Sequence, residues 1–259
     1  MSPKKITDLI QRNNFSYSFE VTPDITIEDI NNLKLNPVFF SVTWHAKSHK
    51  CESLNIGPIR MAKFLRSRRK EVLMHLSCDM LKKLYLNQVL EELQKNNICN
   101  LFVILGGDRE LISYIRAKTG DYFCIGVAGS PDHSRDRLRQ LKEKIDSGAN
   151  FILTQAFFEK DVLNNFLKSC IEIGISVPII PGVFLFENCN QLNGFINLCK
   201  VKVSQDLLEQ VKNKEKSNIP GREIVKKLLQ DVTADTGLNH FHFFTLNKLD
   251  FVSEFVNEL

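Results

Sequence analysis

Short apolar runs alternate with longer amphipathic segments along most of the chain, and this repeat constrains the fold more than any other feature. The runs are rich in β-branched and aromatic residues, which is typical of buried strands. Strands are predicted at residues 16–22, 38–44, 72–78, 100–107, 122–129, 151–158, 177–184 and 240–246.

The segments between these strands have the spacing of helices. Clear examples are LYLNQVLEELQKNN, RDRLRQLKEKIDSG and DVLNNFLKSCIEIG, of which the last two end in Gly, as helices often do. Strands that alternate with helices pair in parallel. Eight such units in 259 residues favour a closed (β/α)8 TIM barrel over an open doubly wound sheet.

The stretch 200–237 is longer than one crossover needs, so an extra helix is predicted between strands seven and eight. A final helix is predicted at 248–259. With no linker or low-complexity tract in view, we expect one α/β catalytic domain that covers residues 1–259.

Composition excludes several classes of protein. No apolar run is long enough for a membrane span, and the start MSPKKITDLIQRNN lacks the apolar stretch of a signal peptide. Seven cysteines without C-x-x-C spacing argue against a disulfide framework or zinc ribbon, so a reducing, cytoplasmic location is expected. The basic stretch at 66–70 is interpreted as a solvated loop, because the net charge is only +4 and no aromatic residues are interleaved. Neither nucleic acid nor membrane is expected as a partner.

Polar side chains collect where the predicted strands end. In the first strand, Glu20 shares the inward face with Ser18, and a buried carboxylate is costly unless it is paired or used. Four further strands carry a polar residue near the same end: Thr43, His75, Asp108 and Gln155. Because chemistry in such barrels lies at the carboxyl ends of the strands, the five residues predict a shared active site.

Nucleotide and metal motifs are not present in the sequence. No G-x-G-x-x-G follows a strand, and there is no P-loop. His240 and His242 have the spacing of a metal pair, but four strand residues still follow, so both are predicted to be buried in the lower or middle barrel. His45 and His49 lie beside lysines in a predicted loop. No metal site is predicted.

Seven segments occur in an order that resembles the methylenetetrahydrofolate reductase family, from about residue 15 to residue 259. They are SFEVTP, SVTWHA, HLSCD, LGGD, SGANFILTQAFFE, VPIIPGVF and FHFFTLN. The resemblance implies an oxidoreductase of one-carbon metabolism and methionine biosynthesis. It implies a two-stage hydride transfer, in which NADH or NADPH reduces FAD and leaves, and the folate then binds at the same flavin face. Nothing in the chain resembles the regulatory domain of many eukaryotic members.

The resemblance also implies roles for individual residues. Glu20 matches the general acid, and Asp108 matches the acid that faces flavin and pterin. Gln155 matches the amide that binds pterin and nicotinamide, Thr43 lies near the nicotinamide, and Lys248 stands at a substrate-binding position. The family's FAD-contact positions are occupied by Thr43, Trp44, Ala46, His75, Gly107, Asp108, Ala128, His133 and Lys144.

The chain departs from the family at the flavin-anchoring positions. Gly106 stands where the family usually has Arg, the helix after His133 begins sooner, and Lys248 replaces an Arg that would form a bidentate fork. Where the family has Asp, Asn and Arg, this chain has Arg137, Gln140 and Glu143.

Three hypotheses therefore stay open. The first is an active reductase that holds FAD more weakly. The second is a reductase of the same folate that transfers hydride directly from the nicotinamide. The third is a non-catalytic relative that binds folate or a partner protein. NADH against NADPH and a homo-oligomeric state also stay open.

Overall fold

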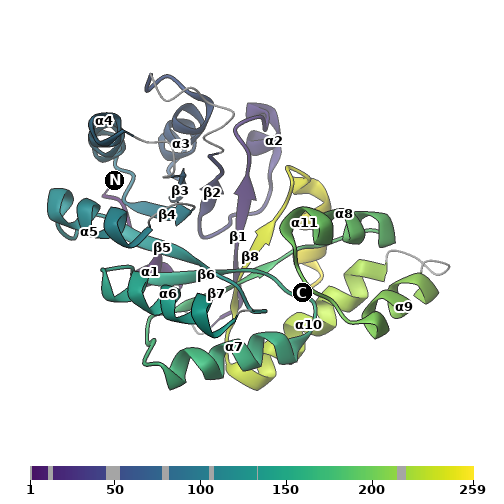
Figure 1. The fold of residues 1–259 in the computed structure, drawn as a ribbon. Coiled ribbons are helices and arrows are strands. Elements are labelled where there is room, and N and C mark those ends of the chain that lie inside the picture. The colour runs from purple at the N-terminus through teal and green to yellow at the C-terminus, as the bar shows by residue number, and fades with distance from the viewer. Residues whose placement is uncertain are drawn as a thin grey trace.

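The computed structural model describes residues 2–10, 14–44, 53–77, 82–104, 108–132, 134–214 and 220–259, apart from the side chains at 108, 214 and 220. Eight parallel strands form a closed barrel in chain order, and the last strand pairs with the first (Figure 1). The strands are β1 (Ser16–Val21), β2 (Phe40–Val42), β3 (Val72–Ser77), β4 (Asn100–Ile104), β5 (Cys124–Gly129), β6 (Phe151–Ala156), β7 (Ile179–Val183) and β8 (His240–Phe244). The predicted barrel is confirmed, and six of the eight strands are shorter than predicted at one or both ends. The predicted ends of β3 and β4 lie outside the described residues.

Helices cover the outside of the barrel. Those that follow β2 to β6 and β8 are α3 (Gly57–Ser67), α4 (Lys83–Lys95), α5 (Asp108–Thr119), α6 (Arg135–Asp146), α7 (Lys160–Glu172) and α11 (Leu249–Asn257). A short α2 (Ile27–Asn32) follows β1. Beyond the ends of α6 and α7, Gly148 (φ 111°) and Gly174 (φ 74°) take the positive φ that favours glycine. Both predicted glycine stops are confirmed.

Three helices separate β7 from β8, where one extra helix was predicted. They are α8 (Cys189–Cys199), α9 (Gln205–Lys214) and α10 (Pro220–Thr236), and α8 and α9 extend to one side of the barrel (Figure 1). Helix α10 returns to the barrel and packs against α7, where Lys160 Nζ lies 3.0 Å from Asp235 Oδ2. No helix in the described part of the chain has both the length and the apolar character needed to cross a membrane.

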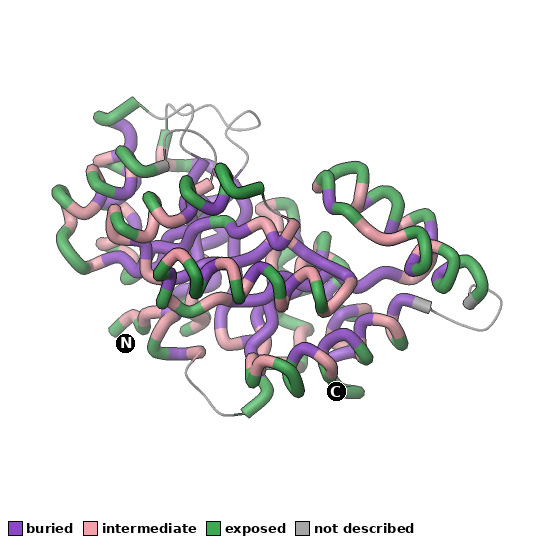
Figure 2. Tube along the Cα trace, turned by 60° about the horizontal axis from the view of Figure 1, so that its bottom comes forward, coloured by how far each residue is buried: buried purple, intermediate pink, exposed green. Residues whose placement is uncertain are grey.

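The strands divide their side chains between two apolar layers. One cluster fills the space between strands and helices and includes Phe19, Val42 and Val127. A second cluster fills the inside of the barrel: Ile6, Phe39, Leu73, Phe102, Cys124, Phe151, Leu153 and Ile180. Figure 2 shows the buried strands enclosed by helices with exposed outer faces. Because side chains alternate along a strand, residues two or four places beyond these interior positions also point inward.

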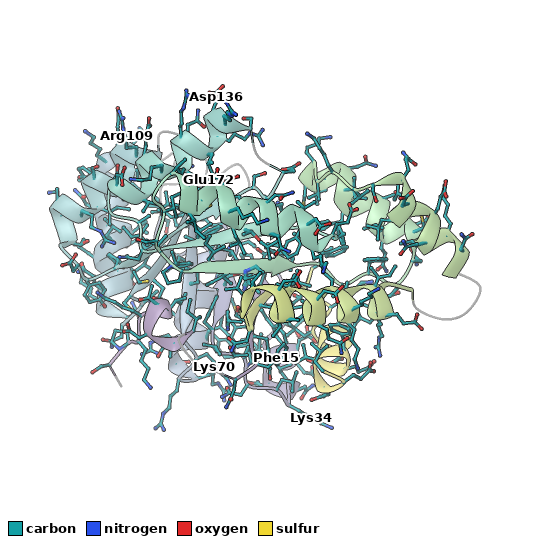
Figure 3. The ribbon with its side chains drawn as sticks, turned by 90° about the horizontal axis from the view of Figure 1, so that it is seen from below. Phe15, Lys34, Lys70, Arg109, Asp136 and Glu172 are labelled. Carbon is teal, nitrogen blue, oxygen red and sulfur yellow. The ribbon has the colours of Figure 1, made fainter. Side chains whose placement is uncertain are left out.

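The amino end of the barrel is closed by α1 (Ile6–Leu9), a short helix that the sequence did not predict. Ile6 is fully buried in the interior cluster, and its backbone N–H donates to Asn100 Oδ1 at 2.9 Å. Asn100 in turn donates through Nδ2 to the Lys4 carbonyl at 3.1 Å. In Figure 3, Phe15 and Lys70, which precede β1 and β3, lie on the opposite side of the molecule from Arg109 and Asp136, which lie in the first turns of α5 and α6. Because α1 closes the amino end, the carboxyl end is where a ligand can enter.

Candidate active site

Inward-facing polar residues meet at the carboxyl end of the barrel. Glu20 lies two places beyond Ser18, whose hydroxyl is bonded inside the barrel to His242. His75 follows the interior Leu73 by two, and Gln155 follows Leu153 by two. Thr43 lies four places beyond the interior Phe39. Four of the five polar residues predicted at the strand ends thus face the barrel interior near the carboxyl ends of the strands.

Glu20 is the central ionisable group at this end of the barrel. Burial raises the pKa of its carboxyl from 4.5 to about 7, because a charged carboxylate loses hydration there. Oε2 of Glu20 lies 3.9 Å from Nε2 of His75, and the two side chains are 15% and 6% exposed. The pKa of the half-buried Cys199 thiol is raised by burial and by the nearby charge of Glu20. Near neutral pH Glu20 can therefore both hold and release a proton.

Two buried polar atoms at the end of β2 have no hydrogen-bond partner within the described ranges. They are Oγ1 of Thr43 and Nε1 of Trp44. Trp44 is fully buried and packs in the layer between strands and helices. Buried polar groups normally find a partner, so both atoms are candidates for contact with a ligand or with the residues that follow.

Gln155 lies on the wall of a pocket of about 180 Å³ beside the barrel mouth. Its Oε1 accepts a hydrogen bond from the Ala156 N–H at 2.9 Å, which leaves the amide nitrogen available to donate. Ionisable side chains from other elements also line this pocket: Asp132, Arg137, Cys199, Lys200 and Lys202. Three of the five are cations, so the pocket favours an anionic ligand.

A neighbouring pocket of about 220 Å³ contains two of the predicted flavin contacts, Ala128 and Lys144. Ala128 is exposed although it lies within a barrel strand. Arg137 and Gln140, from the first two turns of α6, line the same pocket. Ser130 and Arg137 line both pockets, so the two pockets adjoin each other. Together they are called the groove beside β5.

The remaining predicted residues line neither of these two pockets or lie outside the described part of the chain. Lys248 Nζ pairs with Glu187 Oε1 at 3.1 Å, and this hydrogen bond is the main cause that lowers the pKa of Glu187. Asp108 is the first residue of α5, but its side chain lies outside the described part of the chain. Ala46, Gly107 and His133 also lie outside the described residues.

Below Glu20, serines and histidines form a continuous hydrogen-bonded chain. His240 bonds Ser16 Oγ at 2.8 Å and Ser18 Oγ at 3.1 Å. His242 bonds Ser18 Oγ at 2.7 Å and Ser41 Oγ at 3.0 Å. Burial lowers the pKa of His240 to about 3, and that of His242 well below its usual value, so both imidazoles are neutral. Both histidines are buried, as predicted, and no cluster of metal ligands occurs among the described residues.

Sequence reasoning missed Cys199, Lys200 and Lys202 as parts of the site. They lie at the end of α8 and in the connection to α9, far along the chain from Gln155. Lys200 has a φ of 56°, which ends α8 in the left-handed region without the glycine that usually signals such a turn. The sequence around it offers no other indication that it faces the site.

Comparisons with known proteins identify the family of this chain. Residues 5–259 match the family described as Methylenetetrahydrofolate reductase. The chain is 28% identical to "Methylenetetrahydrofolate reductase (NADH) 1" of Arabidopsis thaliana, over 94% of this chain and 48% of that protein. It is 24% identical to "Probable methylenetetrahydrofolate reductase (NADPH)" of Caenorhabditis elegans, over 99% of this chain and 44% of that protein. With "5,10-methylenetetrahydrofolate reductase" of Pectobacterium carotovorum it shares 28% identity, over 95% of this chain and 90% of that protein.

The chain thus spans about half the length of the plant and nematode relatives. Among solved structures it resembles oxaloacetate acetylhydrolase, with a TM-score of 0.58 at 10% identity, covering 98% of this chain and 83% of that one. At that identity the likeness concerns the barrel fold alone.

Proposed function

Because the chain belongs to the methylenetetrahydrofolate reductase family, we propose that it reduces 5,10-methylenetetrahydrofolate to 5-methyltetrahydrofolate with NADH or NADPH. The reaction takes a hydride from the nicotinamide and one proton, and it breaks one carbon–nitrogen bond of the methylene bridge. The site must therefore supply a proton and hold a cationic iminium while the hydride arrives.

The observation that carries this proposal is Glu20 at the barrel mouth. A pKa of about 7 makes the carboxyl a usable acid at neutral pH, where an ordinary carboxyl would already be ionised. Protonation of the departing nitrogen opens the bridge and leaves the iminium. The carboxylate that remains is a negative charge in a partly dry site, which favours the cation.

Side chains along the groove beside β5 support the proposal that FAD would bind there. Arg137 and Lys144 offer cations for the pyrophosphate, and Ala128 leaves the barrel wall uncovered. At the end of β2, buried Thr43 Oγ1 offers a further polar contact at the barrel mouth. When bound, FAD would accept hydride from the nicotinamide and donate it to the folate carbon.

The same proposal assigns the folate and nicotinamide contacts. Gln155 donates its amide hydrogens to the pterin or the nicotinamide, and Thr43 contacts the nicotinamide. The charge of Asp108 is proposed to favour the iminium. Lys248 attracts the carboxylate of the folate, in competition with Glu187. The reaction takes place in the cytoplasm, where thiols such as the five described free cysteines stay reduced.

The test begins with the visible spectrum of the purified protein, followed by assays of NADH and NADPH oxidation with methylenetetrahydrofolate. A flavin band with turnover supports the proposal. A colourless protein that turns over without added FAD indicates direct hydride transfer. Folate binding without turnover, even with added FAD, would overturn the assignment and indicate a binding protein. If the protein binds flavin, Lys144→Ala should lower the affinity for FAD in a fluorescence titration. Lys142→Ala on the same helix is the control.

A further inference from the structure

The turn after β8 is hydrogen-bonded to the end of β1 beyond the point where the strand ladder stops. The last paired residues of these strands are Glu20 and Phe244. One residue later, Thr245 Oγ1 donates a hydrogen bond to the Glu20 carbonyl at 2.6 Å. Thr245 is buried, and its bond to Glu20 is partly buried.

Asn247 makes a second connection, on the other side of Val21. Its Oδ1 accepts from the Thr22 backbone N–H at 2.9 Å, and its Nδ2 donates to Thr22 Oγ1 at 2.6 Å. The Asn247 backbone N–H donates to Thr245 Oγ1 at 3.1 Å, which joins the two connections. The backbone is therefore tied just after Glu20 at two consecutive peptide groups.

The bonds from Thr245 and Asn247 are together called the clamp. The turn that carries them has an unusual backbone conformation. Leu246 and Asn247 have φ values of 48° and 62°, in the left-handed region that non-glycine residues rarely adopt. Asparagine tolerates this region better than leucine does. Two such residues in sequence persist where surrounding bonds determine the conformation.

We infer that Thr245 and Asn247 are positioning residues that hold the Glu20 carboxyl at the barrel mouth by fixing the backbone on its carboxyl side. This inference rests on the proposed function of Glu20 as the acid. A general acid must lie within hydrogen-bond reach of the atom that it protonates, and a misplacement of about 1 Å can cost about 10²-fold in rate. The described ionisable groups near the carboxyl are His75, 3.9 Å away on β3, and Cys199 at the end of α8.

The experiment compares Thr245→Val with Thr245→Ser. Valine keeps the size and branching of threonine but lacks the hydroxyl, whereas serine keeps the hydroxyl. Thr245→Val should lower kcat for folate reduction by about 10- to 100-fold with little change in KM, and Thr245→Ser should stay within about twofold of the parent. Asn247→Gly, which removes both side-chain bonds but suits the positive φ, should behave like Thr245→Val.

A second measurement requires no turnover. Infrared difference spectra of the carboxyl band, assigned with Glu20→Gln, give the pKa of Glu20 in each variant. In Thr245→Val the released carboxyl should gain hydration, and its pKa should fall from about 7 toward 4.5. Circular dichroism checks that each variant folds, and Asn247→Gly provides the test if Thr245→Val does not.

The inference is overturned if Thr245→Val and Asn247→Gly both keep the parent's Glu20 pKa and rate. It is also overturned if Thr245→Ser is as impaired as Thr245→Val, because the hydroxyl would then not be the cause. If the parent reduces no folate but its Glu20 pKa still falls in Thr245→Val, the clamp stands and the proposed function fails.

Discussion

Nε2 of His75 lies 3.9 Å from Oε2 of Glu20, inside a barrel mouth where both side chains are largely buried. The separation is too long for a direct hydrogen bond. Because burial is the cause of its raised pKa, the Glu20 carboxyl holds near neutral pH a proton that can be given to a ligand.

Replacement of this carboxyl by an amide should abolish the chemistry and keep the shape. Glu20→Gln should reduce methylenetetrahydrofolate about 10²- to 10⁴-fold more slowly, because the amide cannot release a proton. Steady-state kinetics measure the loss, and the exposed Glu91→Gln on α4 is the matched control. A Glu20→Gln variant with the parent's rate would exclude Glu20 as the acid.

The activity should depend on pH through the same group. The acid is available while Glu20 is protonated, so kcat should be constant well below pH 7 and fall as pH rises through about 7. Above that pH, the fall approaches tenfold per pH unit when the proton on Glu20 limits the rate. A profile that stays flat from pH 6 to 9 in the parent would contradict this assignment.

Glu20 should also make the protein less stable at high pH. Its pKa is about 7 in the fold and near 4.5 in the unfolded chain, so the fold binds the proton more tightly between these values. Stability from this group is present below pH 4.5 and is lost as pH rises through 7, by a few kcal/mol at most. In urea unfolding, the free energy of unfolding of Glu20→Gln should rise relative to that of the parent between pH 5 and pH 8. That of Glu91→Gln should not.

The neutral histidines should give the opposite dependence. The pKa of His240 is about 3 in the fold against 6.5 in the unfolded chain, so its contribution is full above pH 6.5 and lost as pH falls toward 3. The test uses a Glu20→Gln background, which removes the opposite pH dependence that Glu20 contributes. In that background, His240→Gln should reduce the loss of unfolding free energy as pH falls. It should also cost about 1 kcal/mol at pH 7.5 through altered hydrogen bonds. An unchanged slope between pH 6.5 and 4 would show that His240 titrates normally.

Two helical glycines should respond in opposite directions to alanine. A Cβ on Gly221 in α10 would lie 1.8 Å from the Phe186 carbonyl oxygen, whereas a Cβ on Gly194 in α8 meets nothing within 4 Å. Gly194→Ala should stabilise the protein by about 0.5–1 kcal/mol. Gly221→Ala should destabilise it, because the backbone contact must be opened. Thermal unfolding of the two variants compares their melting temperatures. Equal shifts in melting temperature would contradict the close contact of α10 with Phe186, which lies in the connection after β7.

The fold was predictable because its strands are strongly patterned and alternate with helices. The runs around Leu73, Ile125 and Ile152 are buried on both faces, and such runs are hard to mistake for surface segments. The closing helix α1 was not predictable, because its four residues carry too short a pattern. Its place depends on Asn100, which lies 94 residues from Ile6.

The site was predictable where its residues belong to strands. Glu20, His75 and Gln155 could be placed together because strand parity fixes their direction. Lys200 and Lys202 could not, since they reach the groove from a connection between helices whose path depends on tertiary packing. The bonds from Thr245 to Glu20 and from Asn247 to Thr22 were not predictable either, because they join residues 225 positions apart.

The pairing of Ser16 with His240 has a consequence for how the molecule is made. The strand that carries Glu20 is synthesised well before its partner β8, because Ser16 and His240 lie 224 positions apart in the chain. Contacts of such high sequence separation form slowly, because a long loop must close first. Strand β1 must therefore wait with one edge unpaired, exposed to association with other chains, until β8 has been synthesised. Glu20 acquires its working environment only when the barrel closes.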